Sequence, residues 1–195
     1  YLVVGLVVSV MSVSACGSGG QEAPAEGAGA AALTQLASDI LADHFRRHPT
    51  TATDLGIHTY DGRLEDYSRD AVAAELRTLR TFRSQLERID PATLTLDQQI
   101  DREQLVHALD SDILVLDVIR PWANDPDLYS SGITNAAHVL IKRNFAPPSE
   151  RLKHLIEREK AMRGALAAAR RNLENPPQVY TEIAIEQIDG NRSFF

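Results

Sequence analysis

The spacing of apolar residues constrains the fold of this chain more than any other feature. From Leu33 onward these residues recur at intervals of three and four, as in Leu105, Leu109, Ile113 and Leu116, which places them on one face of an α-helix. Runs in which apolar and polar residues alternate, typical of half-buried β-strands, do not occur after residue 16. The sequence therefore predicts an all-α fold, an array of amphipathic antiparallel helices joined by short connections.

Proline and capping residues indicate where these helices begin and end. Pro49 must end the first helix, because proline lacks a backbone N–H and clashes with the preceding turn inside a helix. Ser68 is a candidate N-cap for the second helix, and Thr95 and Gln98 have the spacing of a capping box at the start of the third. From these signals the helices are expected at about residues 33–48, 68–90, 95–120, 133–143, 148–175 and 179–190.

The first residues of the chain have the character of a secretory signal. Residues 1–15 carry no charge, and this apolar run is short for a membrane-spanning helix, which needs about 20 residues. The sequence VSAC that ends at Cys16 resembles the bacterial lipobox, in which the cysteine receives lipid. We therefore predict a lipoprotein signal peptide at residues 1–16 with lipidation of Cys16, the only cysteine. An uncleaved membrane anchor is the alternative reading.

Small residues dominate the segment that follows, GSGGQEAPAEGAGAAA, so residues 17–32 are expected to form a flexible tether. The lipid on Cys16 would make the membrane a partner and place the folded part on the periplasmic or extracellular face of the cell envelope. The formal net charge of -7 lies wholly after residue 16. An acidic chain without a basic stripe argues against nucleic acid as a partner.

One polar stretch, LGIHTYDGRLEDYS, raises the question of a catalytic site. On a helix, the spacing of His58, Asp61 and Glu65 would place an imidazole and two carboxylates on one face. Asp61 and Gly62 form a turn signal, however, and helix signals resume only after this stretch. We expect an ordered loop, fixed by pairing of Asp61 and Arg63 with each other or with backbone groups; direct chemistry by the loop is the alternative.

A second pair of side chains suggests a metal site and is rejected on sequence grounds. His44 and His48 have the spacing of a helical zinc pair. Phe45, however, stands where a metallopeptidase helix of that type needs a glutamate as general base, and Pro49 disrupts the next turn. No HExxH motif, phosphate-binding loop or nucleophile elbow occurs in the sequence. We therefore assign no catalytic residue and no metal ligand.

Four longer segments carry a family resemblance. The segments HPTTATDLGIHTYDGRLEDYS, IRPWANDP, KRNFAPPSERL and ENPPQVYTEIAIEQ follow one another in this order. Together they resemble the start of the bacterial domain-of-unknown-function 885 family, over about Leu41 to Ile188. The resemblance implies a long, largely helical and exported protein, often a lipoprotein, of which residues 33–195 are the N-terminal part.

The same resemblance implies an activity for the whole protein. Members of the family carry a zinc-peptidase-like helix in their later part, which implies a gluzincin-like hydrolase with peptides or related amides as substrates. That helix is absent from these residues, so we expect no cofactor here and an inactive chain, with zinc only in the full-length protein. His58, Asp61, Arg63 and Tyr67 belong to the first motif of the family, and we interpret them as a loop lining the catalytic cleft.

Two functions from different classes remain open. The chain is either the N-terminal part of a lipid-anchored, metallopeptidase-like hydrolase or a non-enzymatic helical lipoprotein with a binding or scaffolding role. A histidine-glutamate helix encoded downstream of Phe195 would distinguish the first from the second.

Overall fold

The computed structural model describes residues 27–194, and this part of the chain is all-α without a β-strand. The predicted signal peptide, the lipobox at Cys16 and most of the predicted tether lie outside the described residues. The elements are α1 Ala28–Arg47, α2 Pro49–Asp54, η1 His58–Tyr60, α3 Arg69–Glu87, η2 Pro91–Thr93, α4 Leu96–Leu114, η3 Val115–Ile119, α5 Pro121–Asn124, α6 Asp127–Lys142, α7 Pro148–Asn172 and α8 Gln178–Phe194.

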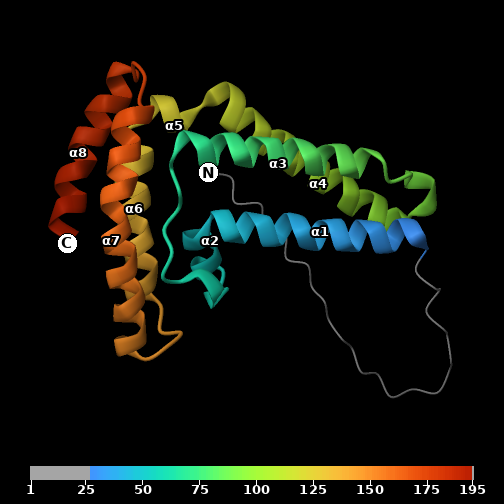
Figure 1. Cartoon of the computed structure of the whole chain (residues 1–195), viewed down its shortest axis with the longest axis horizontal. Helices are drawn as coiled ribbons and strands as arrows, with labels where there is room; N and C mark the ends of the chain where they lie inside the picture. The colour runs from blue at the N-terminus through green and yellow to red at the C-terminus, as the bar shows by residue number, and fades with distance from the viewer. Residues whose placement is uncertain (1–26, 195) are drawn as a thin grey trace.

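The helices form two groups that meet at a corner (Figure 1). Helices α1, α3 and α4 lie side by side in one group, and α6, α7 and α8 run across one end of it. Helix α2 and the loop that follows it occupy the corner, where α2 contacts both α1 and α6. Within residues 27–194, no helix combines the length and apolarity that crossing a bilayer requires.

The core of the first group confirms the predicted apolar stripes. Side chains from α1, α3 and α4 converge there, together with residues of the α3–α4 connection. Burying aliphatic side chains in this way contributes about 1.5–3 kcal/mol each. The buried residues are Ala30, Leu33, Leu36, Leu79, Leu86, Ile89, Leu94, Leu105 and Leu109.

The second group is centred on α6, which contacts both α7 and α8. Its buried face carries Tyr129, Ile133, Ala136, Ala137, Val139 and Leu140. The side chains that α7 and α8 bury against the rest of the molecule are mostly small, with Ala165, Ala168 and Ala169 from α7 and Ala184 from α8. Alanine at these positions allows close approach of the helices, because it adds only one methyl group to each backbone.

Two helices begin earlier than the sequence predicts. Helix α1 begins at Ala28, so residues 28–32, expected in the flexible tether, are helical. Alanine has the highest helix propensity, and Ala30 is buried in the core. Helix α6 begins at Asp127 instead of near residue 133, because burial of Tyr129, only 1% exposed, favours a helix despite the turn-forming sequence.

Two further differences concern α2 and α8. The six-residue α2 was not predicted, and Pro49 both ends α1 and occupies the first turn of α2, where its missing N–H costs nothing. Helix α8 continues past Gly190, the expected end, to Phe194. Asn191 donates to the hydroxyl of Ser130 at 2.8 Å, and this contact with α6 supports the additional turn.

Candidate functional site

The polar stretch singled out in the sequence is a loop at the corner between the two groups of helices. It contains only a short 3₁₀ helix, His58–Tyr60, before α3 begins after Ser68. Gly56 starts the loop with a positive φ of 85°, which residues with a side chain rarely adopt. Leu55 and Gly56 turn the chain at the end of α2, so that the loop folds back along this helix.

The loop is held by Asp61, whose side chain is almost fully buried. Asp61 accepts a hydrogen bond of 2.7 Å from the hydroxyl of Thr53 on α2, and it lies 3.0 Å from Nδ1 of His58. Arg63 does not pair with it; its guanidinium lies over the ring of Tyr60, 5.5 Å from the centroid. The expected Asp61–Arg63 pair is therefore wrong, because α2 brings a closer partner that sequence spacing did not reveal.

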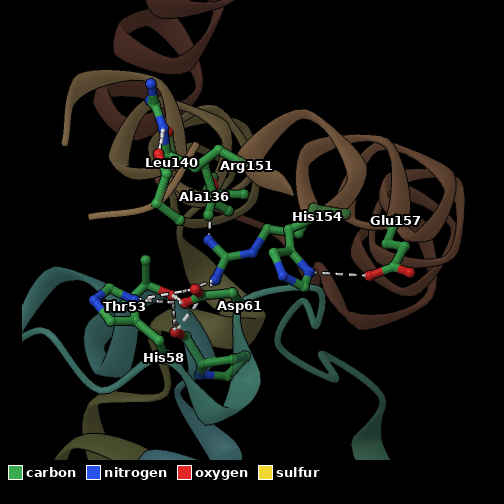
Figure 2. Close-up of polar contacts among 11 residues, drawn as sticks. Thr53, His58, Asp61, Ala136, Leu140, Arg151, His154 and Glu157 are labelled. Atoms are coloured by element: carbon green, nitrogen blue, oxygen red, sulfur yellow. Dashed lines mark hydrogen bonds and ion pairs between the residues drawn. The ribbon is translucent and has the colours of Figure 1, made fainter. Parts of the chain in front are cut away.

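A second helix group enters this network through Arg158 of α7, which is fully buried. Arg158 donates to the hydroxyl of Thr53 at 2.7 Å and to the carbonyl of Pro49 at 3.3 Å. Its other terminal nitrogen donates to the carbonyl of Ala136 on α6 at 2.6 Å. Figure 2 shows Thr53 and Asp61 facing Ala136 across this network. One arginine therefore joins α2, α6 and α7.

The electrostatics of the network depend on the same arginine. Burial lowers the pKa of Arg158, while the carboxylates of Glu65 and Asp61 act in the opposite direction. Its position could have been suspected from the sequence, because Arg158 shares a helical stripe with Ala165, seven residues later, which is also buried. The hydrogen-bond partners of Arg158 could not have been found from the sequence, since Thr53 is 105 positions away.

Glu65 provides a second tether between the loop and α2. Its carboxylate accepts hydrogen bonds of 2.9 Å from both the backbone N–H and the hydroxyl of Thr50. Thr50 lies in the first turn of α2, where a negative charge interacts favourably with the helix dipole. Two acids of the loop, Asp61 and Glu65, therefore act on the two ends of one short helix.

His58 is partly open to solvent, with its side chain 36% exposed. Its ring stacks on Phe145, with centroids 3.8 Å apart and an interplanar angle of 14°. Contact of Nδ1 with the buried carboxylate of Asp61 places the proton on that nitrogen. No hydrogen bond joins Nε2 to another residue in the described part of the chain. An imidazole held in this way can accept a proton or a hydrogen bond from a molecule at the surface.

Close packing against α7 leaves no room for a side chain at Gly62, which follows Asp61 in the loop. A Cβ atom here would clash with the carboxylate of Glu157, and it would lie 3.1 Å from Nδ1 of His154. His154 and Glu157 contact each other at 3.3 Å, so a second histidine–acid pair lies beside the first (Figure 2). Glycine at position 62 allows the loop to lie directly on α7.

Tyr67 packs against the second group of helices. Its ring lies 5.2 Å from that of Tyr129, and its carbonyl accepts a hydrogen bond of 2.6 Å from Asn172. A hollow of about 580 Å³ is lined by Asp54, Asn135, His138, Val139, Lys142 and Arg143. None of the four predicted cleft residues lines it. The role of His58, Asp61, Arg63 and Tyr67 in lining a cleft stays a prediction.

The two histidines of α1 lie in a separate cluster. Nε2 of His48 is 2.8 Å from a carboxylate oxygen of Glu75 on α3. Burial alone would lower the pKa of His48, but the hydrogen bond and charge of Glu75 raise it above the usual value. Burial lowers the pKa of His44 to about 4, and it raises that of nearby Asp112. The pKa values of the two histidines are therefore shifted in opposite directions.

These residues do not fit a zinc site. Among residues 27–194, no group of three or more His, Cys, Asp or Glu side chains is arranged to hold a metal ion. The rings of His44 and His48 lie 4.6 Å apart, and one of them is already engaged by Glu75. Where the metal implied by the family resemblance would bind stays a prediction.

Known proteins resemble this chain over most of its described length. A family model described as bacterial protein of unknown function (DUF885) matches residues 49–195. A solved structure from Shewanella oneidensis, described as a candidate lipoprotein of unknown function, aligns with a TM-score of 0.76 at 26% sequence identity. The alignment covers 83% of this chain and 29% of that chain, so this chain spans less than a third of its length. No curated protein matches the chain.

Proposed function

Because this chain belongs to the DUF885 family of bacterial proteins, we propose that it is the N-terminal helical part of a longer, lipid-anchored hydrolase. In this proposal, residues 33–195 support a catalytic part that acts on peptides or related amides. The length of the Shewanella oneidensis relative supports this view, because this chain aligns with only 29% of it. The zinc helix implied by the family resemblance would belong to the remaining part.

The supporting role rests on one observation: the side chains of Asp61, His48 and Arg158 are bound within the fold. Asp61 is engaged by Thr53 and His58, and His48 by Glu75. Arg158 is engaged by the hydroxyl of Thr53 and by backbone carbonyls. Side chains held in this way stabilise helix packing and are not available to a substrate. Their arrangement favours a scaffold over a catalytic centre.

His58 provides a partly exposed group at the surface of this scaffold. Its Nδ1 is fixed by Asp61, and its ring is stacked on Phe145. In the proposal, the loop lines the cleft between this part and the catalytic part, where His58 would meet the substrate through Nε2. No step of the hydrolysis is assigned to it.

Anchoring of the protein is part of the same proposal. Cys16 would carry the lipid, and the membrane would hold the folded part at the cell envelope, on its periplasmic or extracellular face. The description of the Shewanella oneidensis relative as a candidate lipoprotein supports this location. An exported hydrolase of this kind would meet peptides outside the cytoplasm.

The proposal is tested first by reading the gene downstream of Phe195 for a helix with a histidine-glutamate pair. The longer product is then purified and assayed for hydrolysis of a mixed peptide set. Replacing the glutamate of that helix with glutamine should abolish hydrolysis without changing the circular dichroism spectrum. Activity that survives this replacement would show that the chemistry lies elsewhere.

The alternative function, a non-enzymatic helical lipoprotein with a binding or scaffolding role, makes the opposite prediction. It expects no such helix downstream and no hydrolysis by the longer product. The exposed apolar surface of α8 is compatible with both functions. The assay of the longer product therefore decides between them.

A further inference from the structure

Helix α8 packs on the rest of the molecule through a narrow strip of its surface. It contacts α6 along this strip, where Ala184 is 2% exposed and Asn191 hydrogen-bonds to Ser130. Ala184 and Asn191 are small or polar, and Phe194 at the end of α8 adds a ring contact with His138 of α6, with centroids 6.0 Å apart. The strip therefore covers little of the apolar surface that α8 carries.

Large apolar side chains lie uncovered on both sides of this strip, and α8 exposes more of them than any other helix in residues 27–194. Scattered surface aliphatic residues need no explanation, but a concentration on one helix indicates a contact surface. We define the α8 apolar surface by the exposed residues on its two flanks, Tyr180, Ile183, Ile185 and Ile188.

Charged residues define the limit of this surface. Glu182, Glu186 and Asp189 follow one another at intervals of four and three, so they form one stripe along the outermost side of α8. Polar residues therefore occupy the side facing away from α6, while the apolar residues occupy the flanks next to it. A partner that fits would lie beside α6 and α8 in the same layer of helices.

We propose that amphipathic helices from the remaining part of the longer protein pack on the α8 apolar surface. The inference rests on the proposed function only in taking this chain as part of a longer polypeptide. The Shewanella oneidensis relative has most of its length outside the aligned region, which provides enough chain to cover this surface. The apolar flanks match the apolar stripe of an amphipathic helix.

Two other occupants fit the surface less well. A membrane of anionic lipid would meet the acidic stripe of α8 and a chain with a formal net charge of -7. A second copy of the chain, related by two-fold symmetry, would bring the acidic stripes of two α8 helices close together. Further helices of the same polypeptide can place neutral or basic residues opposite these acids.

Thiol labelling tests this contact directly. In a Cys16→Ser background, Ile183→Cys is compared with Glu186→Cys, which lies on the outer stripe of the same helix. In the 195-residue chain, both thiols should react at similar rates, because both positions are exposed. In the longer gene product, the thiol at position 183 should react at least roughly tenfold more slowly than in the 195-residue chain. The reaction rate of the thiol at position 186 should be unchanged. Ile188→Cys provides a second apolar position if Ile183→Cys fails to fold.

Equal labelling at positions 183 and 186 in the longer product would overturn the inference. Protection at 183 that appears in the 195-residue chain and grows with its concentration would assign the surface to a second copy, and would also overturn it. Protection that appears only with anionic vesicles would do the same. Labelling does not depend on hydrolysis, so this contact and the proposed activity can fail separately.

Discussion

At the scale of single residues, the burial of Arg158 explains the arrangement around it. Its guanidinium is fully buried, and Nε has no hydrogen-bond partner within residues 27–194. The nearby carboxylates of Asp61 and Glu65 balance its charge. Removing one member of a buried charge network leaves the other uncompensated, which costs more than an exposed ion pair contributes.

Asp61→Asn tests this network. The sequence alone suggested a partly exposed pair with a contribution on the order of 1 kcal/mol. Asp61 is instead 3% exposed, so we expect its replacement to lower the free energy of unfolding by about 3 kcal/mol, measured by urea denaturation. Asp54→Asn is the control, because Asp54 is 53% exposed and pairs with an exposed arginine. Equal and small losses in both variants would contradict a buried network.

The histidines of α1 predict how stability depends on pH. Burial lowers the pKa of His44 to about 4, whereas an unfolded histidine titrates near 6.5. Between these values the unfolded state binds the proton and the folded state does not, so stability falls as the pH falls from about 6.5 to 4. The loss is up to about 3 kcal/mol, since one pKa unit corresponds to about 1.4 kcal/mol.

His48 gives stability the opposite dependence on pH. Its pKa is raised by Glu75, so its contribution is fully present below about 6.5 and is lost as the pH rises through the raised value. Urea midpoints measured from pH 4.5 to 9 should therefore pass through a maximum near neutral pH. His44→Gln should flatten the acid side and His48→Gln the alkaline side. An acid side that is unchanged in His44→Gln would show that the histidine is not buried as described.

The candidate site shows which residues sequence reasoning can find. The turn at Asp61 and Gly62 is encoded locally, so the loop was predicted. The partners of Asp61 were not, because Thr53 belongs to an unpredicted helix and Arg158 to a helix of the other group. Contacts of this kind form only when the helix groups pack together.

At the scale of elements, the helices with local boundary signals were predicted well. Ser68 caps α3 by accepting a hydrogen bond from the N–H of Ala71, and Thr95 and Gln98 form the capping box at the start of α4. The start of α6 was missed, because its first turns contain residues typical of loops and are stabilised by the burial of Tyr129. Local signals therefore determine some helix ends, and tertiary packing determines the others.

Thr95→Ala tests the contribution of the capping box. Thr95 accepts from the N–H of Gln98 at 3.3 Å, and the side chain of Gln98 accepts from the N–H of Thr95 at 3.0 Å. Loss of the threonine oxygen should lower the free energy of unfolding by about 1 kcal/mol, measured by thermal denaturation. Thr81→Ala is a control from a helix interior, where the hydroxyl bonds only to the carbonyl four residues earlier. A larger loss in the control would contradict the role of the cap.

At the scale of the whole molecule, two groups of helices form one body through the corner at α2. Arg158 of α7 reaches the carbonyl of Pro49 and the hydroxyl of Thr53, both on α2. Asn172 of the same helix donates to the carbonyl of Tyr67 at 2.6 Å. The loop is thus bound at both ends by hydrogen bonds that join the two groups of helices.

We predict that this body is anchored to the membrane through Cys16. In a bacterial host that supplies a complete signal sequence, Cys16→Ser should abolish incorporation of labelled fatty acid, because Cys16 is the only cysteine in the sequence. The wild-type chain processed in parallel is the control. Label that persists in the variant would place the lipid on another residue and contradict the lipobox assignment.

The most direct test of the account is the zinc content of the purified 195-residue chain, measured beside that of the longer gene product. We predict no stoichiometric zinc in the shorter chain, since within residues 27–194 no set of side chains is arranged to hold a metal ion. The longer product should retain stoichiometric zinc after dialysis. Stoichiometric zinc in the shorter chain that is lost on replacing His44 and His48 would contradict the account and place the metal centre on α1.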